Sequence, residues 1–176
     1  MKNARIPVLG FAAYSGSGKT TLLTRLIPLL KHKGLRLGLI KHSHHNFEID
    51  QPGKDSHRLR VAGADTVLLV SRQRRAVITE FPSHEEPRLE EQIRHLDQSV
   101  LDLILVEGFK TENFPKIEIH RPALHKPLLY PHDPSVIAIA ADQQLVVPSN
   151  LTLLDLNQPD RIADFVMTFI QEFEHV

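Results

Sequence analysis

A short segment rich in glycine, serine and threonine has the residue types and spacing of a phosphate-binding loop. Gly16 and Gly18 allow the backbone to turn so that successive N–H groups face an anion. Lys19 adds a positive charge that reaches the outer phosphates, and the hydroxyl of Thr20 lies where a phosphate-bound magnesium ion takes an oxygen ligand. The segment therefore predicts a site for a phosphate-bearing ligand. The expected binding residues are Ser15, Gly16, Ser17, Gly18, Lys19, Thr20 and Thr21.

The flanking sequence supports this interpretation. An apolar run at 6–11 precedes the segment and a helical pattern at 22–30 follows it, which is the strand-loop-helix context that the motif requires. The usual pattern opens with glycine, whereas this chain has Ala13, whose small methyl group we expect the loop to tolerate. The alternative is a glycine- and serine-rich turn with an incidental Lys-Thr pair, and the context favours phosphate binding.

A second candidate residue, Glu107, ends the apolar strand expected at 101–106. Ligands of open α/β sheets bind at the carboxyl ends of the strands, and the phosphate loop leaves its own strand at that same edge. We therefore expect Glu107 to hold magnesium through water or to orient an attacking water, with Lys19 as its catalytic partner. Asp102 begins the same strand, so it is expected at the opposite edge and is a poor metal candidate. The alternative is that Glu107 ends a strand in solvent.

The loop at 41–50 carries His42, His44, His45 and Asp50. These side chains have the chemistry to ligate a transition metal, to contact an anionic substrate or to respond to the γ-phosphate of a nucleotide. His-x-His-His spacing alone is a weak metal signature, and a solvated polar loop is the plain alternative. We favour substrate contact or nucleotide-dependent switching, with Asp50 as a further carboxylate on the magnesium side.

A basic helical face follows this loop. Lys54 and Arg58 are four residues apart, so they share one face of the helix expected at 54–62. Beside a phosphate loop, such a face has the charge to bind a second phosphate-bearing ligand. The alternative is a solvated charged helix.

The composition limits the class of protein. Lysine and arginine total 21 and aspartate and glutamate total 21, so the net charge does not favour a general nucleic-acid surface. Cysteine is absent, which excludes disulfides and thiolate metal sites within the chain. A short polar start and the lack of a bilayer-length apolar stretch give no sign of a signal peptide or a membrane span, and we expect a cytoplasmic protein.

Strand and helix patterns alternate along the chain, which predicts an α/β fold with a mostly parallel sheet flanked by helices, the P-loop NTPase fold. At 176 residues we expect a single nucleotide-binding domain, 1–176. The run at 101–106 is the most hydrophobic and is expected to be central, whereas 116–120 alternates and is expected to be edge-like or half-exposed. The proline-rich residues 121–135 are expected to form an irregular surface loop. Strands are expected at 6–12, 35–41, 66–70, 76–79, 101–106, 116–120, 136–141 and 151–156, and helices at 19–32, 54–62, 85–96 and 161–173.

In combination, these motifs resemble those of the MobB family, the molybdopterin-guanine dinucleotide biosynthesis adapter proteins. The similar blocks follow the order of the family and cover most of the first 110 residues, so the combination is specific although the phosphate loop alone is not. The blocks lie at 13–21, 38–45, 50–56, 62–64 and 101–110.

The resemblance implies a cytoplasmic GTP-binding protein with weak GTPase activity and a bound Mg²⁺. It implies a homodimer that acts beside the molybdopterin guanylyltransferase, the enzyme that joins GMP to the molybdopterin cofactor. It implies that residues 15–21 bind the nucleotide and that Thr20 and Glu107 face the magnesium ion. Related GTPases often carry an extra lysine where this chain has Tyr14, and its loss fits slow hydrolysis. One residue, Asp142 at the end of a strand, is a candidate for recognising the edge of the guanine base.

Two other functions use the same loop. A small-molecule kinase needs a lid of arginines, for which Arg72, Arg74 and Arg75 are candidates, but it also needs a base that nothing in the sequence clearly supplies. A GTPase metal chaperone would use the histidines, but the missing cysteine counts against it because soft-metal relays usually employ thiolates. No nucleic-acid or membrane partner is expected.

Overall fold

The computed structural model describes residues 1–43, 47–82 and 85–174. The chain divides into two compact units, the first formed by 1–42 with 88–176 and the second by 43–87, where the sequence predicts a single domain. The helices are α1 Lys19–His32, α2 Asp55–Val61, α3 Leu89–Gln92 and α4 Pro159–Glu174. The strands are β1 Val8–Ala12, β2 Leu37–Lys41, β3 Thr66–Val70, β4 Arg75–Thr79, β5 Leu103–Glu107, β6 Lys116–His120, β7 Val136–Ala141 and β8 Thr152–Asp155.

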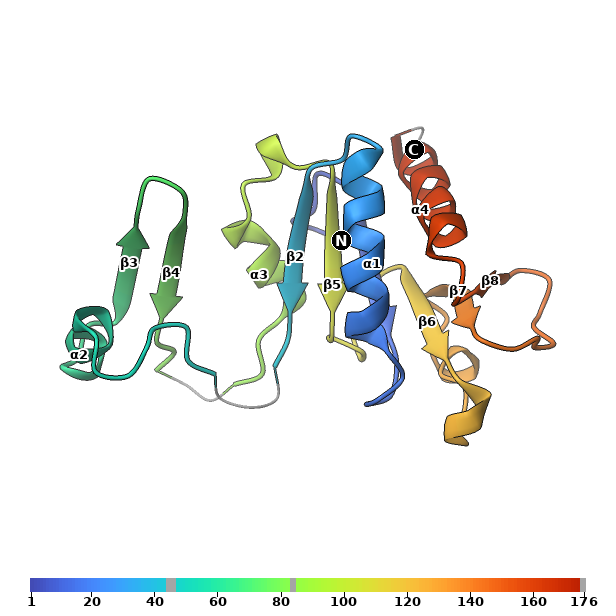
Figure 1. Cartoon of the computed structure of the whole chain (residues 1–176), viewed down its shortest axis with the longest axis horizontal. Coiled ribbons are helices and arrows are strands. Elements are labelled where there is room, and N and C mark those ends of the chain that lie inside the picture. The colour runs from blue at the N-terminus through green and yellow to red at the C-terminus, as the bar shows by residue number, and fades with distance from the viewer. Residues whose placement is uncertain (44–46, 83–84, 175–176) are drawn as a thin grey trace. The chain divides into compact units, whose positions relative to one another are not determined.

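The first unit is a parallel six-stranded sheet with helices on both faces, as the sequence predicts. The strand order is β2-β5-β1-β6-β7-β8, and every paired strand runs parallel to its neighbour. Helices α1 and α4 pack together on one face, over a core that includes Leu9, Phe11 and Leu26 (Figure 1). Helix α3 packs on the other face, where its Leu89 joins Val106. Parallel pairing brings the carboxyl ends of all six strands to one edge of the sheet.

The position of β6 corrects one prediction. The alternation of polar and apolar residues in 116–120 predicts an edge-like strand, but β6 lies between β1 and β7 and every residue in it is buried. The side chain of Lys116 is 1% exposed, and its ammonium donates to Asp133 Oδ2 and Ser135 Oγ, each at 2.8 Å. Because a buried cation is tolerated when it is paired, these partners allow a lysine in the middle of the sheet.

The second buried charge of β6 anchors the proline-rich loop. Glu118 accepts hydrogen bonds from the backbone N–H groups of Leu129 at 2.7 Å and Tyr130 at 2.9 Å. Burial raises the pKa of the Glu118 carboxyl, while the two N–H donors act in the opposite direction. Residues 121–135 are therefore held against the sheet by polar side chains, with two short 3₁₀ turns, rather than lying loose over the surface.

The helix expected at 85–96 is much shorter than predicted. Helix α3 begins at Leu89, two residues after Pro87, and passes into a 3₁₀ turn at Ile93–His95. Proline disfavours the helical conformation in the residue before it, which accounts for the late start. Among the helices of the described residues, none is long and apolar enough to span a bilayer.

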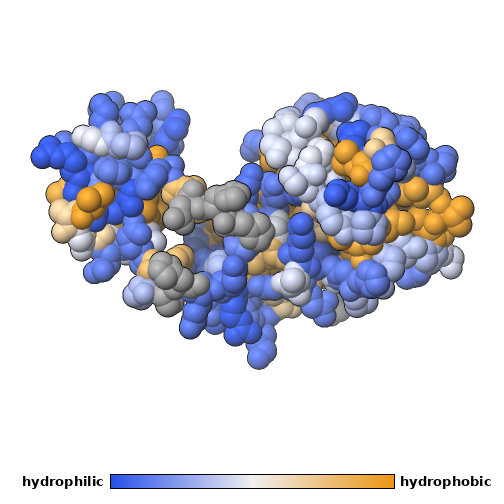
Figure 2. Space-filling model, turned by 90° about the horizontal axis from the view of Figure 1, so that it is seen from below, coloured by the Kyte–Doolittle hydropathy of each residue, from blue (hydrophilic) through white to orange (hydrophobic). Residues whose placement is uncertain are grey.

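The second unit, 43–87, contains α2 and the antiparallel hairpin β3–β4. One face of the hairpin is apolar and exposed: Leu68 and Val77 are cross-strand partners, 60% and 57% exposed, and Val70 on the same face is 75% exposed. Hydrophobic residues are visible in orange on the surface of this unit, at the left of Figure 2. Arg75, Thr66 and Thr79 lie on the same face, so the exposed apolar residues of the hairpin are interspersed with polar ones.

Candidate functional site

The phosphate loop follows β1 at the carboxyl edge of the sheet and enters α1. Gly16 and Gly18 have φ angles of 79° and 91°, which belong to the left-handed region where a side chain is costly. Among the described residues, the backbone N–H groups of Gly16, Gly18, Lys19 and Thr20 donate to no backbone carbonyl. Unpaired N–H groups in a left-handed turn at the start of a helix form a concave donor surface, which is a binding geometry for an anion.

Lys19 lies folded over this loop. Its ammonium donates to the carbonyl oxygens of Ala13 at 3.1 Å and Tyr14 at 3.4 Å, so its charge is held beside the free N–H groups. Burial lowers the pKa of Lys19, and the positive charges of Lys110 and Lys41 lower it further, against an opposing effect of Glu107. A cation crowded by other cations gains free energy when an anion binds beside it.

Glu107 occupies the place predicted for it at the carboxyl end of β5. It is in register with Phe11, one of the last residues of β1 before the phosphate loop, and its side chain is 14% exposed. Lys41 ends β2 on the other side, and its ammonium lies 3.5 Å from Glu107 Oε2. The strand register therefore brings the carboxylate, Lys41 and the phosphate loop to one edge. Asp102 lies at the opposite edge, as predicted, where it pairs with Arg36 at 2.6 Å.

A further lysine reaches the loop from the turn after β5. The ammonium of Lys110 lies 5.7 Å from the ring centroid of Tyr14, the residue that stands where related loops often have a lysine. An ammonium over an aromatic face is a favourable contact. The uncharged ring of Tyr14 therefore keeps the positive charge of Lys110 near the loop. Sequence reasoning did not assign a role to Lys41 or Lys110, because single lysines at strand ends carry no motif.

The turn that presents Lys110 has an unusual backbone. Gly108 and Phe109 have φ angles of 101° and 51°, and Phe109 is the rarer case because it carries a side chain. A Cβ atom at Gly108 would lie 2.7 Å from the Cβ atom of His42, so a larger residue would clash there. The ring of His42 stacks on the ring of Phe109, with their centroids 4.8 Å apart. The backbone N–H of His42 also donates to the carbonyl of Glu107 at 2.8 Å. His42 thus packs against this turn and helps to shape it.

The donor set suits magnesium better than a transition metal. Thr20 and Glu107 carry hard oxygen atoms, and Mg²⁺ is typically held by one or two protein oxygens together with phosphate and water. Within the described residues, no cluster of three or more histidine, aspartate or glutamate side chains has the arrangement of a metal site. His44 and His45, two of the histidines considered as metal ligands, lie outside the described residues.

Sequence reasoning missed Arg121, which follows β6. Its Nε–H donates to the carbonyl of Ser17 in the phosphate loop at 3.1 Å, and its Nη1 lies 2.7 Å from Asp142 Oδ2. Asp142 follows β7, so the pair links the ends of two neighbouring strands. The sequence predicts 116–120 to be an edge-like or half-exposed strand and gives no strand order, so nothing pointed to Arg121 as a neighbour of the phosphate loop. The correct strand order would have brought Arg121 beside the loop.

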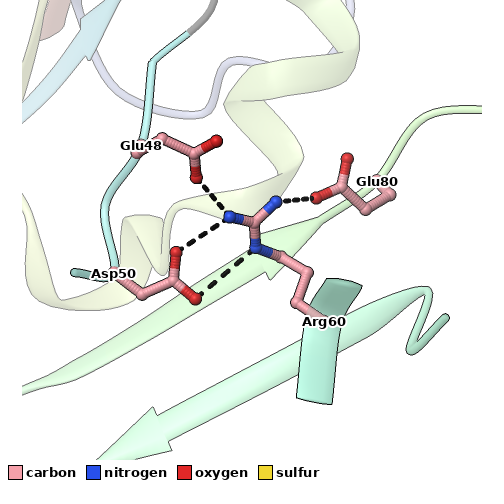
Figure 3. Close-up of polar contacts among 4 residues, drawn as sticks. All are labelled: Glu48, Asp50, Arg60 and Glu80. Carbon is pink, nitrogen blue, oxygen red and sulfur yellow. Dashed lines mark hydrogen bonds and ion pairs between the residues drawn. The ribbon is translucent and has the colours of Figure 1, made fainter. Parts of the chain in front are cut away.

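Asp50 has a structural partner within the second unit. Its side chain is 1% exposed, and its two oxygens lie 3.0 and 3.5 Å from Nη2 and Nε of Arg60 on α2. The same guanidinium also binds Glu48 and, at 2.6 Å, Glu80 beyond β4 (Figure 3). Asp50 therefore links its loop to α2, and both of its carboxylate oxygens are bound to Arg60 rather than available to a magnesium ion.

The other candidates of the second unit are exposed. Lys54 precedes α2 and Arg58 lies on it, in keeping with the predicted basic face. Arg72 and Arg74 lie in the turn of the β3–β4 hairpin, and Arg75 begins β4.

Three comparisons place the chain among known proteins. The family model described as molybdopterin guanine dinucleotide synthesis protein B, MobB, matches residues 8–142. The molybdopterin-guanine dinucleotide biosynthesis adapter protein of Escherichia coli K12 is 51% identical over 170 residues, 95% of each chain. The protein of the same name from Haemophilus influenzae is 45% identical, over 97% of this chain and 93% of that one. The crystal structure of Bacillus subtilis MobB is 25% identical with a TM-score of 0.72, over 94% of this chain and 98% of that one.

The Arg60 contacts predict a measurable pKa. Because the guanidinium hydrogen-bonds the carboxylate, the pKa of Asp50 lies below its ordinary value. The pair therefore stabilises the unit above the ordinary aspartate pKa, and this contribution is lost as the pH falls through the lowered one. In an NMR titration, Arg60→Gln is expected to raise the pKa of Asp50, whereas Arg58→Gln on the same helix is not. An unchanged Asp50 pKa in Arg60→Gln would contradict this role.

Proposed function

The chain belongs to the MobB family, and we propose that it is a GTP-binding adapter with weak GTPase activity in the synthesis of molybdopterin guanine dinucleotide. The observation that best supports nucleotide binding is the phosphate loop. In this loop, free N–H groups and the Lys19 ammonium converge on one concave surface. The adapter role is supported by the names of relatives that match nearly the whole chain. We also propose that the protein acts in the cytoplasm, as the sequence predicts.

Charge supports a triphosphate as the ligand. The charges of Lys41, Lys110 and Glu107 all act on Lys19, and Lys41 lies 3.5 Å from Glu107, so these four side chains together carry an excess of positive charge. The terminal phosphates of a nucleotide would compensate that excess. In the proposed complex, Lys19 exchanges its two carbonyl contacts for phosphate oxygens, since an ammonium binds a phosphate more strongly than a neutral carbonyl.

We propose that Glu107 acts in hydrolysis. A new bond forms between a water oxygen and the γ-phosphorus, and the bond to the β–γ bridging oxygen breaks, so that GDP and phosphate leave. Glu107 accepts a hydrogen bond from the attacking water and orients it, and the water's proton passes to the phosphate product. Thr20 and Glu107 would hold magnesium, which would supply positive charge to neutralise the phosphates. Tyr14 supplies no ammonium of its own, which fits a slow reaction.

We propose that Asp142 contributes a preference for guanine. Asp142 was the candidate for the base edge, and one of its oxygens is already bound to Arg121. Its other oxygen, Oδ1, is buried and accepts no hydrogen bond from the described residues. A carboxylate oxygen suits the N–H donors of guanine better than the acceptor N1 of adenine, so this atom supports GTP over ATP.

The proposed partners are a second copy of the chain, the molybdopterin guanylyltransferase and its molybdopterin cofactor. The exposed apolar face of the hairpin, with Leu68, Val70 and Val77, supports the homodimer, because burial of such residues against a second copy is favourable. The exposed basic residues Lys54 and Arg58 are the proposed contact for a phosphate-bearing ligand such as the pterin.

Lys19→Ala is expected to weaken the binding of magnesium GTP by about tenfold or more, because a charge-assisted contact with phosphate is lost. The fold should remain, since the hydrogen bonds of the Lys19 side chain among the described residues go to loop carbonyls. Calorimetric titration measures the affinity, and Lys31→Ala in the last turn of the same helix is the matched control. Equal affinities of the wild type and Lys19→Ala would rule out this role of the loop.

Glu107→Gln is expected to slow GTP hydrolysis by about tenfold or more while changing GTP affinity less, because the amide is a poorer acceptor for the attacking water. Phosphate release at saturating GTP gives the rate, and titration gives the affinity. Glu91→Gln, an exposed change on α3, serves as the control. Turnover unaffected in Glu107→Gln would remove this residue from catalysis.

The double variant Leu68→Glu/Val77→Glu is expected to raise the dimer dissociation constant by about tenfold or more, because two charges replace apolar contacts. Light scattering after size-exclusion chromatography reports the mass over a concentration series. Val146→Glu is the matched control, since Val146 is 99% exposed and lies in the other unit. A monomeric wild type, or a variant as dimeric as the wild type, would contradict the proposed interface.

A further inference from the structure

We infer that Arg121 and Asp142 brace the phosphate loop, as positioning residues that set its affinity for phosphate independently of the base. The inference rests on the proposed nucleotide binding and extends it to two residues that follow β6 and β7. Both lie in the same compact unit as the loop. The contact between Arg121 and Ser17 joins residues 104 positions apart in the chain, so it links the loop to a distant part of the sheet.

The first argument is the hydrogen-bond requirement of the loop. When successive N–H groups turn inward toward an anion, the carbonyl groups between them turn outward and need donors. Lys19 and the N–H of Ser17 provide donors for the carbonyl of Tyr14, at 3.4 and 3.3 Å. The carbonyl of Ser17 instead receives the Nε–H of Arg121, at 3.1 Å. Arg121 thus satisfies the carbonyl that lies immediately before Gly18.

The second argument is steric. Gly18 has a φ angle of 91°, and a Cβ built on it would lie 3.4 Å from Nη2 of Arg121. The guanidinium therefore packs against the left-handed residue that immediately precedes α1, in addition to its hydrogen bond one residue earlier. Two contacts on consecutive residues restrict the peptide between Ser17 and Gly18, whose orientation decides where the next N–H groups point.

Asp142 holds Arg121 in this position. Its Oδ2 lies 2.7 Å from Nη1, and the two side chains are 19% and 34% exposed, so the pair is partly shielded from water. A charge-assisted contact of this length fixes the plane of the guanidinium. Asp142 also offsets the positive charge of Arg121, which keeps the arginine behind the loop rather than among the phosphates.

Two roles of Asp142 can be distinguished by which ligands bind more weakly when it is lost. If it acts through Arg121 on the loop, its loss weakens every ligand that carries the same phosphates. If it only reads the base through its free Oδ1, its loss weakens GTP alone. Magnesium tripolyphosphate, which has no base, distinguishes the two because it engages only the phosphate loop.

The experiment measures the affinities of the full-length chain for magnesium GTP, magnesium ATP and magnesium tripolyphosphate by calorimetry. Arg121→Ala is expected to lower all three by a common factor of about ten, as for loss of hydrogen bonds made by a charged group. Asp142→Asn is expected to lower the ATP and tripolyphosphate affinities by a smaller common factor, and the GTP affinity by at least that factor because Oδ1 is also proposed to bind guanine. Arg121→Lys is expected to restore part of the loss. Thermal unfolding curves establish that each variant is folded at the titration temperature.

Arg36→Ala is the matched control, because Arg36 and Asp102 form a similar ion pair at the opposite edge of the same sheet. Its affinities should equal those of the wild type. Unchanged affinities in folded Arg121→Ala would overturn the inference, and so would a loss confined to GTP. A wild type that binds ATP and tripolyphosphate but not GTP would defeat the proposed function and still test the brace. A wild type that binds none of the three would defeat both.

Discussion

The parallel pairing of β1 with β5 and β6 is the constraint on which the rest of this structure depends. It brings the phosphate loop, Glu107 and Arg121 to one edge of the sheet, although they come from distant parts of the chain. The same pairing buries β1 on both faces, so the loop starts from a rigid strand. Left-handed glycines then turn the chain into α1, where free N–H groups collect.

The electrostatics of this edge follow from that pairing. Lys41 and Glu107 are register partners in β2 and β5, and Lys19 and Lys110 add charge from the loop and from the turn after β5. The mutual repulsion of these cations is tolerable in a folded protein when an anion shares the site. On the other side of the loop, Asp142 neutralises Arg121, so the positive charge that remains uncompensated lies on the Glu107 side.

The sequence was most informative where the pattern is local. The strand, loop and helix around Lys19, the parallel fold and the position of Glu107 were all predictable, because each depends on neighbouring residues. The placement of β6 was not, because Lys116 and Glu118 read as half-exposed until their partners at 129–135 are known. Without a strand order, Arg121 is not recognised as a neighbour of the phosphate loop. Asp50 was chosen for its charge, and its partner Arg60 becomes apparent only when α2 folds back on the loop.

The central claim is that this loop binds the phosphates of a magnesium nucleotide. A crystal structure of the protein with magnesium and a non-hydrolysable GTP analogue tests it most directly. The account predicts β- and γ-phosphate oxygens within hydrogen-bond distance of Lys19 Nζ and of the N–H groups of Gly18 and Thr20. A nucleotide bound elsewhere, with Lys19 still donating to the carbonyl oxygens of Ala13 and Tyr14, would contradict it.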